Sequence, residues 1–207
     1  MYAILDIETT GGQYNEEGIT EIAIYKFDGH EVIDQFISLI NPEKPIQPFV
    51  VKLTGINNAM LRSAPKFYEV AKRIIEITEG CILVAHNASF DYRILRTEFN
   101  RLGYDFKVPT LCTVELSKKL ILDQPSYSLG KLVRSLGIPM ADRHRASGDA
   151  LATVQLFKLL LAKDTEKEIV KSFIKTEIKS GMLPKLLDIV EALPSKTGIY
   201  YIHNENG

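Results

Sequence analysis

The sequence has little cysteine, almost no net charge and no long apolar run, and each scarcity excludes a class of protein. The two cysteines, Cys81 and Cys112, lie in apolar surroundings without metal-ligand spacing, which favours reduced thiols over a disulfide framework. A formal net charge of -1 excludes a globally basic surface, so a polyanion would have to be bound locally. No stretch approaches the roughly 20 apolar residues of a membrane span, and no basic signal-peptide start is present. We therefore expect a soluble, cytoplasmic protein without a membrane association.

The order of the predicted elements indicates an α/β fold. A hydrophobic content of 45% supports a buried core. Apolar patterning predicts strands at 2–7, 22–27, 32–40 and 81–86, with a turn at Asp28-Gly29 and a Pro-rich loop after the third. Helical spacing predicts helices at 67–75, 89–102, 114–122 and 128–136, and another from about residue 147. Strands first and β-α units after them predict a mixed sheet flanked by helices.

Two acids stand inside the first apolar run, ILDIE, where they need an explanation. Successive side chains of a strand point to opposite faces, so Asp6 and Glu8 project side by side. Strand interiors select against both residue types, and two adjacent anions raise each other's pKa unless a cation neutralises them. We therefore expect a cation beside this strand.

The motif HNASFD links a predicted buried strand to a helix. Asn87 or Ser89 is available as the N-cap, and Asp91 falls in the first turn. An acid is favoured there by the helix dipole, so a purely structural role is the competing interpretation of this motif.

The motif HRASGDA repeats the arrangement before the next long helix. Ser147 is the predicted N-cap, Asp149 falls in the first turn, and His144 stands just before the helix, from where it can fold back over that turn. Helix entries of this kind can cluster at one edge of a sheet in α/β proteins.

Together the motifs predict a site with four carboxylates, from Asp6, Glu8, Asp91 and Asp149, with His144 beside them. Hard oxygen ligands in this number suit Mg²⁺ or Mn²⁺, and no Cys/His cluster competes for zinc. Helix caps and a hydrogen-bonded histidine are the structural alternative. That alternative does not explain the two acids inside one strand.

The three motifs DIETTG, HNASFD and HRASGDA, in this order and spacing, resemble those of the DEDDh 3′-to-5′ exonucleases. Within that family the sequence is most similar to the proofreading epsilon subunit of bacterial DNA polymerase III. The resemblance covers about Tyr2 to Lys163 and includes the segment SYSLGKLVRSLGI. It implies a ribonuclease H-like fold.

The resemblance also implies a catalytic set. It assigns Asp6, Glu8, Asp91 and Asp149 as ligands of two divalent cations, with Asp6 bridging them, and His144 as the general base. Two such ions about 4 Å apart stabilise the attacking and leaving oxygens of an in-line displacement at phosphorus. A histidine accepts a proton near neutral pH.

Further residues are implied as contacts of the 3′-terminal nucleotide. Thr9, Thr10 and Gly11 would contact it through amides and hydroxyls, and Phe90 would pack near its base or sugar, although a core role for Phe90 is an equal alternative. Many relatives carry a bulky apolar residue after TTG, where this chain has Gly12.

The composition changes beyond Lys163. We expect an exonuclease domain at 1–164, a helical segment at 165–193 and a further start of a domain at 194–207. The stretch LPSKTGIYYIHNENG resembles the opening of GIY-YIG nuclease domains, with Gly198, Ile199 and Tyr200 matching the first half of that motif. An ordinary terminal strand is the alternative.

The predicted function is a metal-dependent 3′-to-5′ exonuclease that releases nucleoside 5′-monophosphates from single-stranded or frayed DNA ends, in replication proofreading or repair. A DNA polymerase is the candidate protein partner. An RNA-trimming exonuclease remains an alternative because nothing in the sequence recognises the 2′-hydroxyl. The second alternative is an inactive nucleic-acid-binding or polymerase-docking module.

Overall fold

A five-stranded mixed sheet forms the centre of the protein, whose computed structural model describes residues 1–141 and 143–176. Three strands form an antiparallel meander, and two more add parallel to the first, in the order β3-β2-β1-β4-β5. The strands are β1 (Tyr2–Thr9), β2 (Ile19–Phe27), β3 (Val32–Leu39), β4 (Ile82–Ala85) and β5 (Thr110–Cys112). The predicted mixed sheet is confirmed. Strand β5 was not predicted because its three residues are too few to show a pattern.

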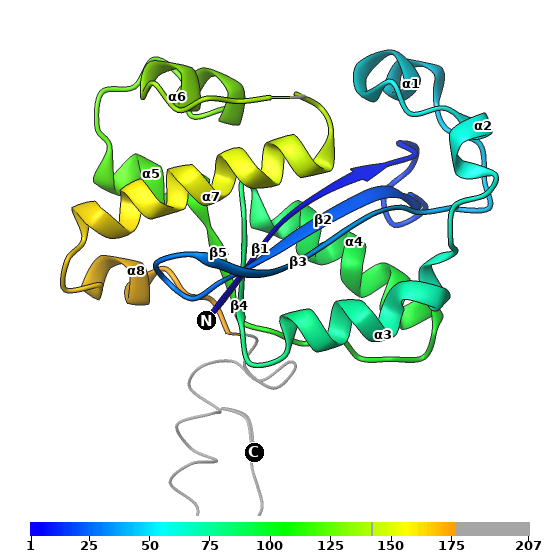
Figure 1. Ribbon diagram of the computed structural model, residues 1–207, viewed down its shortest axis with the longest axis horizontal. Helices are drawn as coiled ribbons and strands as arrows, with labels where there is room; N and C mark the ends of the chain where they lie inside the picture. The colour runs from blue at the N-terminus through cyan, green and yellow to red at the C-terminus, as the bar shows by residue number, and fades with distance from the viewer. Residues whose placement is uncertain (142, 177–207) are drawn as a thin grey trace, which may run out of the picture. The chain divides into compact units, whose positions relative to one another are not determined.

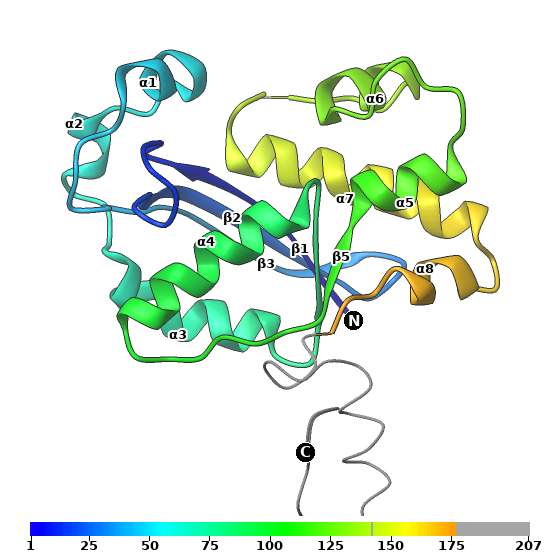
Figure 2. The same cartoon turned by 180° about the vertical axis from the view of Figure 1, so that it is seen from behind.

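Helices cover both faces of the sheet (Figures 1 and 2). One face carries α3 (Phe67–Thr78) and α4 (Ala88–Arg101). The other carries α5 (Thr113–Leu120), α7 (Ala146–Lys163) and α8 (Glu168–Ser172), with α6 (Leu129–Ser135) packed on α7. None of the helices in the described part of the chain is both long and apolar enough to cross a bilayer.

The Pro-rich loop after β3 contains two short helices that the sequence analysis did not predict. Helix α1 (Pro48–Thr54) begins with a proline, whose missing N–H is unneeded at a first helical position. Helix α2 (Asn58–Leu61) is capped by Asn57, whose side chain accepts hydrogen bonds from two amides. Both lie beside the end of β1 (Figure 1).

Successive side chains of β1 point to opposite faces of the sheet and so belong to two separate hydrophobic cores. Ala3, Leu5 and Ile7 belong to the core under α3 and α4, whereas Ile4 belongs to the core under α7. Residues two apart share a face, so Asp6 and Glu8 continue the α7 side of the strand.

Strand β1 extends beyond its neighbour β4. It pairs with β2 over its whole length, but with β4 only from Tyr2 to Ile4. The edge of β1 that faces β4 is therefore open from Leu5 onward. The chain after β4 turns there into α4, and an open edge beside the carboxyl ends of parallel strands is where sites form in α/β folds.

The starts of α4 and α7 both follow a residue with left-handed backbone. Asn87 is the N-cap of α4 with φ 89, so one of the two predicted caps is confirmed, although its side chain makes no capping bond. The prediction of Ser147 as the N-cap of α7 is wrong, because the N-cap is Arg145 and Ser147 lies inside the first turn. His144, just before it, has φ 63.

The described chain continues to pack against the domain after residue 164. Val170 of α8 belongs to the core under α7, and Lys175 exchanges two backbone hydrogen bonds of 2.8 Å with Thr110 of β5. The expected boundary at 164 stays a prediction. Residues 177–193 of the expected helical segment and the expected GIY-YIG start at 194–207 lie outside the described residues. Both cysteines are free, as expected.

Candidate active site

Three of the four predicted carboxylates meet at one point. Oxygen atoms of Asp6, Glu8 and Asp149 all lie within 4.8 Å of one another. Asp6 and Glu8 come from β1 and Asp149 from the first turn of α7, which packs across the same face of the sheet. In β2, opposite Asp6, stands Ala23, a small side chain on the face where α7 approaches. The sequence spacing thus predicted this cluster.

Asp91 approaches the cluster from the other side of the sheet. It lies in the first turn of α4, is 4% exposed, and accepts hydrogen bonds from its own amide and from the amide of Ile7. Ile7 offers that amide beyond the last residue of β1 that pairs with β4. Asp91 is outside the group of three oxygens within 4.8 Å, yet its charge is the strongest electrostatic influence on Asp6.

The cluster is electrostatically unfavourable without a cation. Burial, followed by the charges of Asp91, Asp149, Glu8 and Glu21, raises the pKa of Asp6 well above its usual value. Burial and then the neighbouring carboxylates raise the pKa of Glu8 to about 8, against the lowering effect of Arg145.

The pKa values of Asp91 and Asp149 are also raised, but different groups oppose the increase at each residue. Burial raises the pKa of Asp91 to about 8, although two backbone amides act in the opposite direction. Burial also raises the pKa of Asp149, while the amide and charge of His144 and the charge of Arg143 lower it. In each of these positions a bare carboxylate is unfavourable, so binding of a proton or a cation to it is favoured.

His144 lies beside the carboxylates, as expected. A cavity of about 350 Å³ is lined by Asp6, Asp149 and His144 together with residues of the α6 start. The histidine is half-buried, and its backbone amide donates a hydrogen bond to the Asp149 carboxylate. The left-handed backbone of His144 is what turns the chain from the cavity wall into α7.

Glu21 is a residue of this site that the sequence analysis missed. It stands opposite Glu8 in β2, is 2% exposed, and accepts hydrogen bonds from the Arg145 guanidinium at 2.6 and 3.0 Å. It also accepts one from the Ala146 amide at 2.8 Å, so a strand residue caps α7. Nothing local to the HRASGDA motif could have shown it, because the cap comes from 125 residues earlier.

His86 is a second missed residue, and it lines the same cavity. Its Nε2 lies 2.8 Å from the carbonyl oxygen of Tyr127, and its Nδ1 lies 2.9 Å from the Thr113 hydroxyl. Burial lowers the pKa of His86, which favours the neutral ring. A neutral ring that donates to the carbonyl and accepts from the hydroxyl fixes the loop before α6 to the end of β4.

The expected nucleotide-binding loop has a defined shape. Thr10 is 1% exposed, and its hydroxyl bonds within the loop, to the carbonyl of Gly11 and the amide of Gly18. A Cβ at Gly11 would lie 2.9 Å from a methyl group of Val50, so no other residue fits between the loop and α1. Thr10 thus shapes the loop, and direct contacts of Thr9, Thr10 and Gly11 with a nucleotide stay a prediction.

Phe90 is half-buried and packs against the core under α4, in agreement with the core role that was the alternative for this residue. It also faces the Arg93 guanidinium at 5.4 Å, and that group lies 4.3 Å from the exposed ring of Tyr14. Arg93 is held by Glu17 at 2.8 Å. A role of Phe90 at a base or sugar remains a prediction.

The donor set fits a divalent cation. All four acids supply hard oxygen atoms, and Asp149 Oδ1 is buried without a hydrogen-bond partner among the described residues. An unpartnered buried oxygen facing two further carboxylates is unfavourable unless a cation binds there. Among the described residues, the cluster consists of the three acids alone, without cysteine or histidine, and such a set of oxygen donors suits a hard divalent cation.

Comparison with known proteins finds exonucleases and a DNA polymerase among the relatives of this chain. The chain is 34% identical over 201 residues to the PolC-type DNA polymerase III of Caldanaerobacter subterraneus subsp. tengcongensis, which covers 97% of this chain and 14% of that protein. It is 31% identical over 220 residues to a putative bifunctional exonuclease/endonuclease of Mycobacterium tuberculosis, covering 100% of this chain and 34% of that protein. It is 33% identical over 202 residues to the 3′-5′ exonuclease DinG of Staphylococcus epidermidis, and this match covers 94% of this chain and 22% of that protein. The chain therefore spans about a third or less of these relatives.

A solved structure of similar size also matches. Exonuclease X, in complex with 5′-overhanging duplex DNA, superposes with a TM-score of 0.64 and 29% identity, covering 80% of this chain and 93% of that one. This match confirms the expected ribonuclease H-like architecture. The sequence pattern of the exonuclease family RNase_T matches residues 3–157, which is well over half of the chain. The protein is thus a member of the RNase_T exonuclease family.

Proposed function

We propose that this protein is a metal-dependent 3′-to-5′ exonuclease that releases nucleoside 5′-monophosphates from single-stranded or frayed 3′ ends of DNA. The observation that carries the proposal is the meeting of Asp6, Glu8 and Asp149 within 4.8 Å of one another, next to a cavity that Asp6, Asp149 and His144 line. The relatives support it, since one is a 3′-5′ exonuclease and a protein of similar structure is an exonuclease in complex with 5′-overhanging duplex DNA.

Asp6, Glu8, Asp91 and Asp149 would hold two divalent cations, Mg²⁺ or Mn²⁺. Such a pair stabilises negative charge on both the attacking and the leaving oxygen of a displacement at phosphorus. The two amides that hold Asp91 fix its orientation, and the arrangement of Glu21 and Arg145 fixes the helix that presents Asp149. These contacts preorganise the ligands before substrate arrives.

His144 is the proposed general base. His144 and Asp149 line the same cavity, and this supports a role for the imidazole in accepting a proton from the attacking water molecule. The half-buried Phe90 and the loop of Thr9, Thr10 and Gly11 then hold the terminal nucleotide.

The wider context is also a proposal. Similarity to a PolC-type DNA polymerase III supports a role in replication proofreading with a DNA polymerase as partner, and repair is the alternative setting. Similarity over the full chain to a putative exonuclease/endonuclease supports a further nuclease segment starting within 194–207. The two free cysteines support a cytoplasmic location.

The test is degradation of a 5′-labelled single-stranded DNA oligomer with Mg²⁺ or Mn²⁺, with Asp6→Ala as the inactive control and Asp34→Asn as a matched acid far from the cluster. A ladder that shortens from the 3′ end, kept in Asp34→Asn and lost in Asp6→Ala, is the expected result. Faster degradation of a matched RNA oligomer would replace the DNA assignment with the RNA-trimming alternative. No cleavage of either polymer would leave the inactive binding module as the better account.

A further inference from the structure

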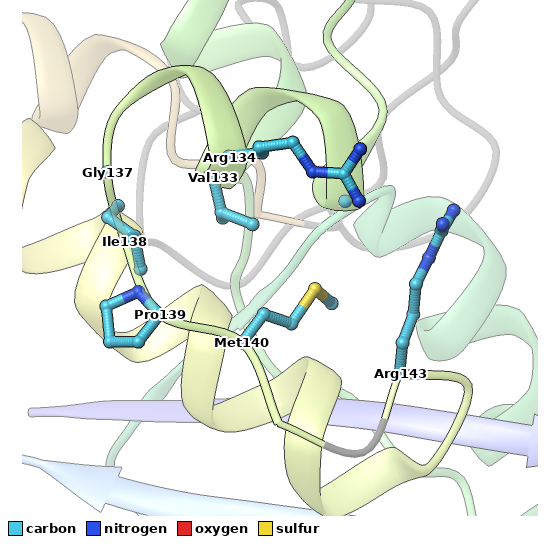
Figure 3. A pocket seen from close by; sticks show the side chains of 8 residues that line it. Val133, Arg134, Gly137, Ile138, Pro139, Met140 and Arg143 are labelled. Atoms are coloured by element: carbon cyan, nitrogen blue, oxygen red, sulfur yellow. The ribbon is translucent and has the colours of Figure 1, made fainter.

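A second cavity, of about 430 Å³, lies between α6 and the segment that leads into α7. Its floor is apolar, with Val133 from α6 and Ile138 and Met140 from the following segment. Figure 3 shows the guanidinium ends of Arg134 and Arg143 on the same side of this floor, with Met140 between their stems. We call this cavity the arginine pocket.

The two guanidinium groups are available to a ligand. Arg134 and Arg143 are exposed, no acidic residue lines the pocket, and neither arginine forms an ion pair with a carboxylate in residues 1–141 and 143–176. The planar guanidinium group suits the oxygen atoms of a phosphate, to which it can donate two hydrogen bonds. The pocket therefore offers positive charge beside an apolar surface.

Gly130 determines where one of these charges lies. A Cβ at this helical position would lie 2.9 Å from the Cζ and Nε atoms of Arg143, so the guanidinium rests against the bare backbone of α6. Any side chain at position 130 would displace it. Because Gly130 has an ordinary helical backbone, replacing it by alanine tests the position of Arg143 without straining the helix.

The arginine pocket is continuous with the catalytic cavity. Gly130, Met140 and Arg143 line both of them, and Arg143 directly precedes His144 in the chain. A polymer whose end lies at Asp6 and Asp149 can therefore extend into the arginine pocket without leaving the protein surface.

We propose that the arginine pocket binds a nucleotide of the substrate strand on the 5′ side of the scissile bond, with its phosphate on Arg134 and Arg143 and its base or sugar on Ile138 and Met140. The inference rests on the proposed exonuclease function. A free phosphate ion would leave the apolar floor uncovered, and an apolar peptide would leave two arginines unneutralised. An internal nucleotide satisfies both parts of the pocket, since phosphate contacts position a strand and apolar side chains support its bases.

Binding measurements test the proposal independently of catalysis. The affinity of a 5′-fluorescein single-stranded oligomer of about 12 nucleotides is followed by anisotropy in EDTA over a range of salt concentrations. Arg134→Gln and Arg143→Gln should each weaken binding about tenfold and reduce the salt slope by about 0.7, the value for one phosphate contact to a single strand. Gly130→Ala should reproduce the effect of Arg143→Gln. Lys72→Gln, a charge change on α3, should leave the slope unchanged.

The outcomes separate the two proposals. If the wild-type protein cleaves DNA while both arginine variants keep the wild-type slope and affinity, the arginine pocket is excluded and the exonuclease function stands. If the loss appears only with a 5′-overhanging duplex, the complementary strand occupies the pocket, and the assignment to the substrate strand is wrong. If the wild-type protein neither binds nor cleaves DNA or RNA, both proposals fail.

Discussion

The starts of α4 and α7 both present an acid to the candidate site, but their surroundings differ. Each presents an acid from its first turn, and each follows a residue with positive φ, Asn87 or His144. At the start of α4, the His86 ring lies against Thr113 and Tyr127, and Asp91 is buried. The start of α7 is half-exposed and is capped by Glu21 of β2. Both helix starts depend on residues that are distant in the sequence, but the acid of α4 is buried whereas the acid of α7 is only partly so.

Neutralising either helix acid should produce the largest effect. Asp91→Asn and Asp149→Asn should each reduce kcat/KM by about 10²- to 10³-fold or more, because each removes a charge that is proposed to hold a cation. Their effects on stability should differ. Asp91→Asn should raise the Tm of the metal-free protein at pH 8.5, since Asp91 has a pKa of about 8 and is charged and buried there.

Calorimetric unfolding in EDTA measures that difference, with Asp34→Asn as a control for the loss of an acid elsewhere. A fall in Tm for Asp91→Asn at pH 8.5 would show that its two amide hydrogen bonds outweigh its burial.

Glu21→Gln should have the next largest effect, a loss of metal affinity. The amide keeps the shape of the side chain but weakens the contact with Arg145, so α7 and Asp149 lose their fixed position. We expect a 10- to 100-fold loss of Mn²⁺ affinity, typical of residues that orient a ligand. Titration calorimetry with Mn²⁺ gives this value directly. Asp34→Asn, which breaks the ion pair between Asp34 of β3 and Arg73 of α3, should leave the affinity unchanged. Equal affinities in Glu21→Gln and wild type would remove Glu21 from the site.

The stability of the metal-free protein should fall as pH rises. Glu8 and Asp91 have pKa values of about 8 in the folded state, whereas both titrate near 4 in an unfolded chain. Between about pH 4 and 8 the folded state therefore binds more protons, and raising the pH within this window favours unfolding. Above pH 8 the dependence should flatten.

Tm values in EDTA at several pH values between pH 5.5 and pH 9 measure this slope, and Glu8→Gln isolates the part due to Glu8. The slope should be shallower in the variant and should disappear in wild type when Mn²⁺ is added. A slope that is the same in Glu8→Gln would assign the pH dependence to other groups.

Ser147→Ala should have the smallest effect. An N-cap serine is worth about 1 kcal/mol, but Ser147 lies within the helix and contributes its backbone carbonyl to Tyr25. The free energy of unfolding should therefore change by less than about 0.5 kcal/mol. Urea unfolding measures it, and Asn57→Ala, which removes the cap of α2, provides the comparison. A loss near 1 kcal/mol for Ser147→Ala would restore the local cap that the sequence predicts.

The sequence predicted what depends on neighbouring residues. Alternation placed Asp6 and Glu8 on one face, and helix-start patterns placed Asp91 and Asp149 in first turns, as the structure has them. Contacts over long separations were not predictable. Glu21 looks like an ordinary strand residue until β2 lies under α7, and Gly130 shows its importance only beside Arg143. Helices α1 and α2 were hidden by prolines, which also begin helices.

The two separate cores on the faces of the sheet bear on how this protein is made. Asp6 and Glu8 appear early during synthesis, but Asp149 belongs to α7, which packs on the opposite core from the helix of Asp91. A nascent chain without α7 therefore has no complete set of acids, however well its first half folds. The nuclease site can therefore form only after α7 has left the ribosome.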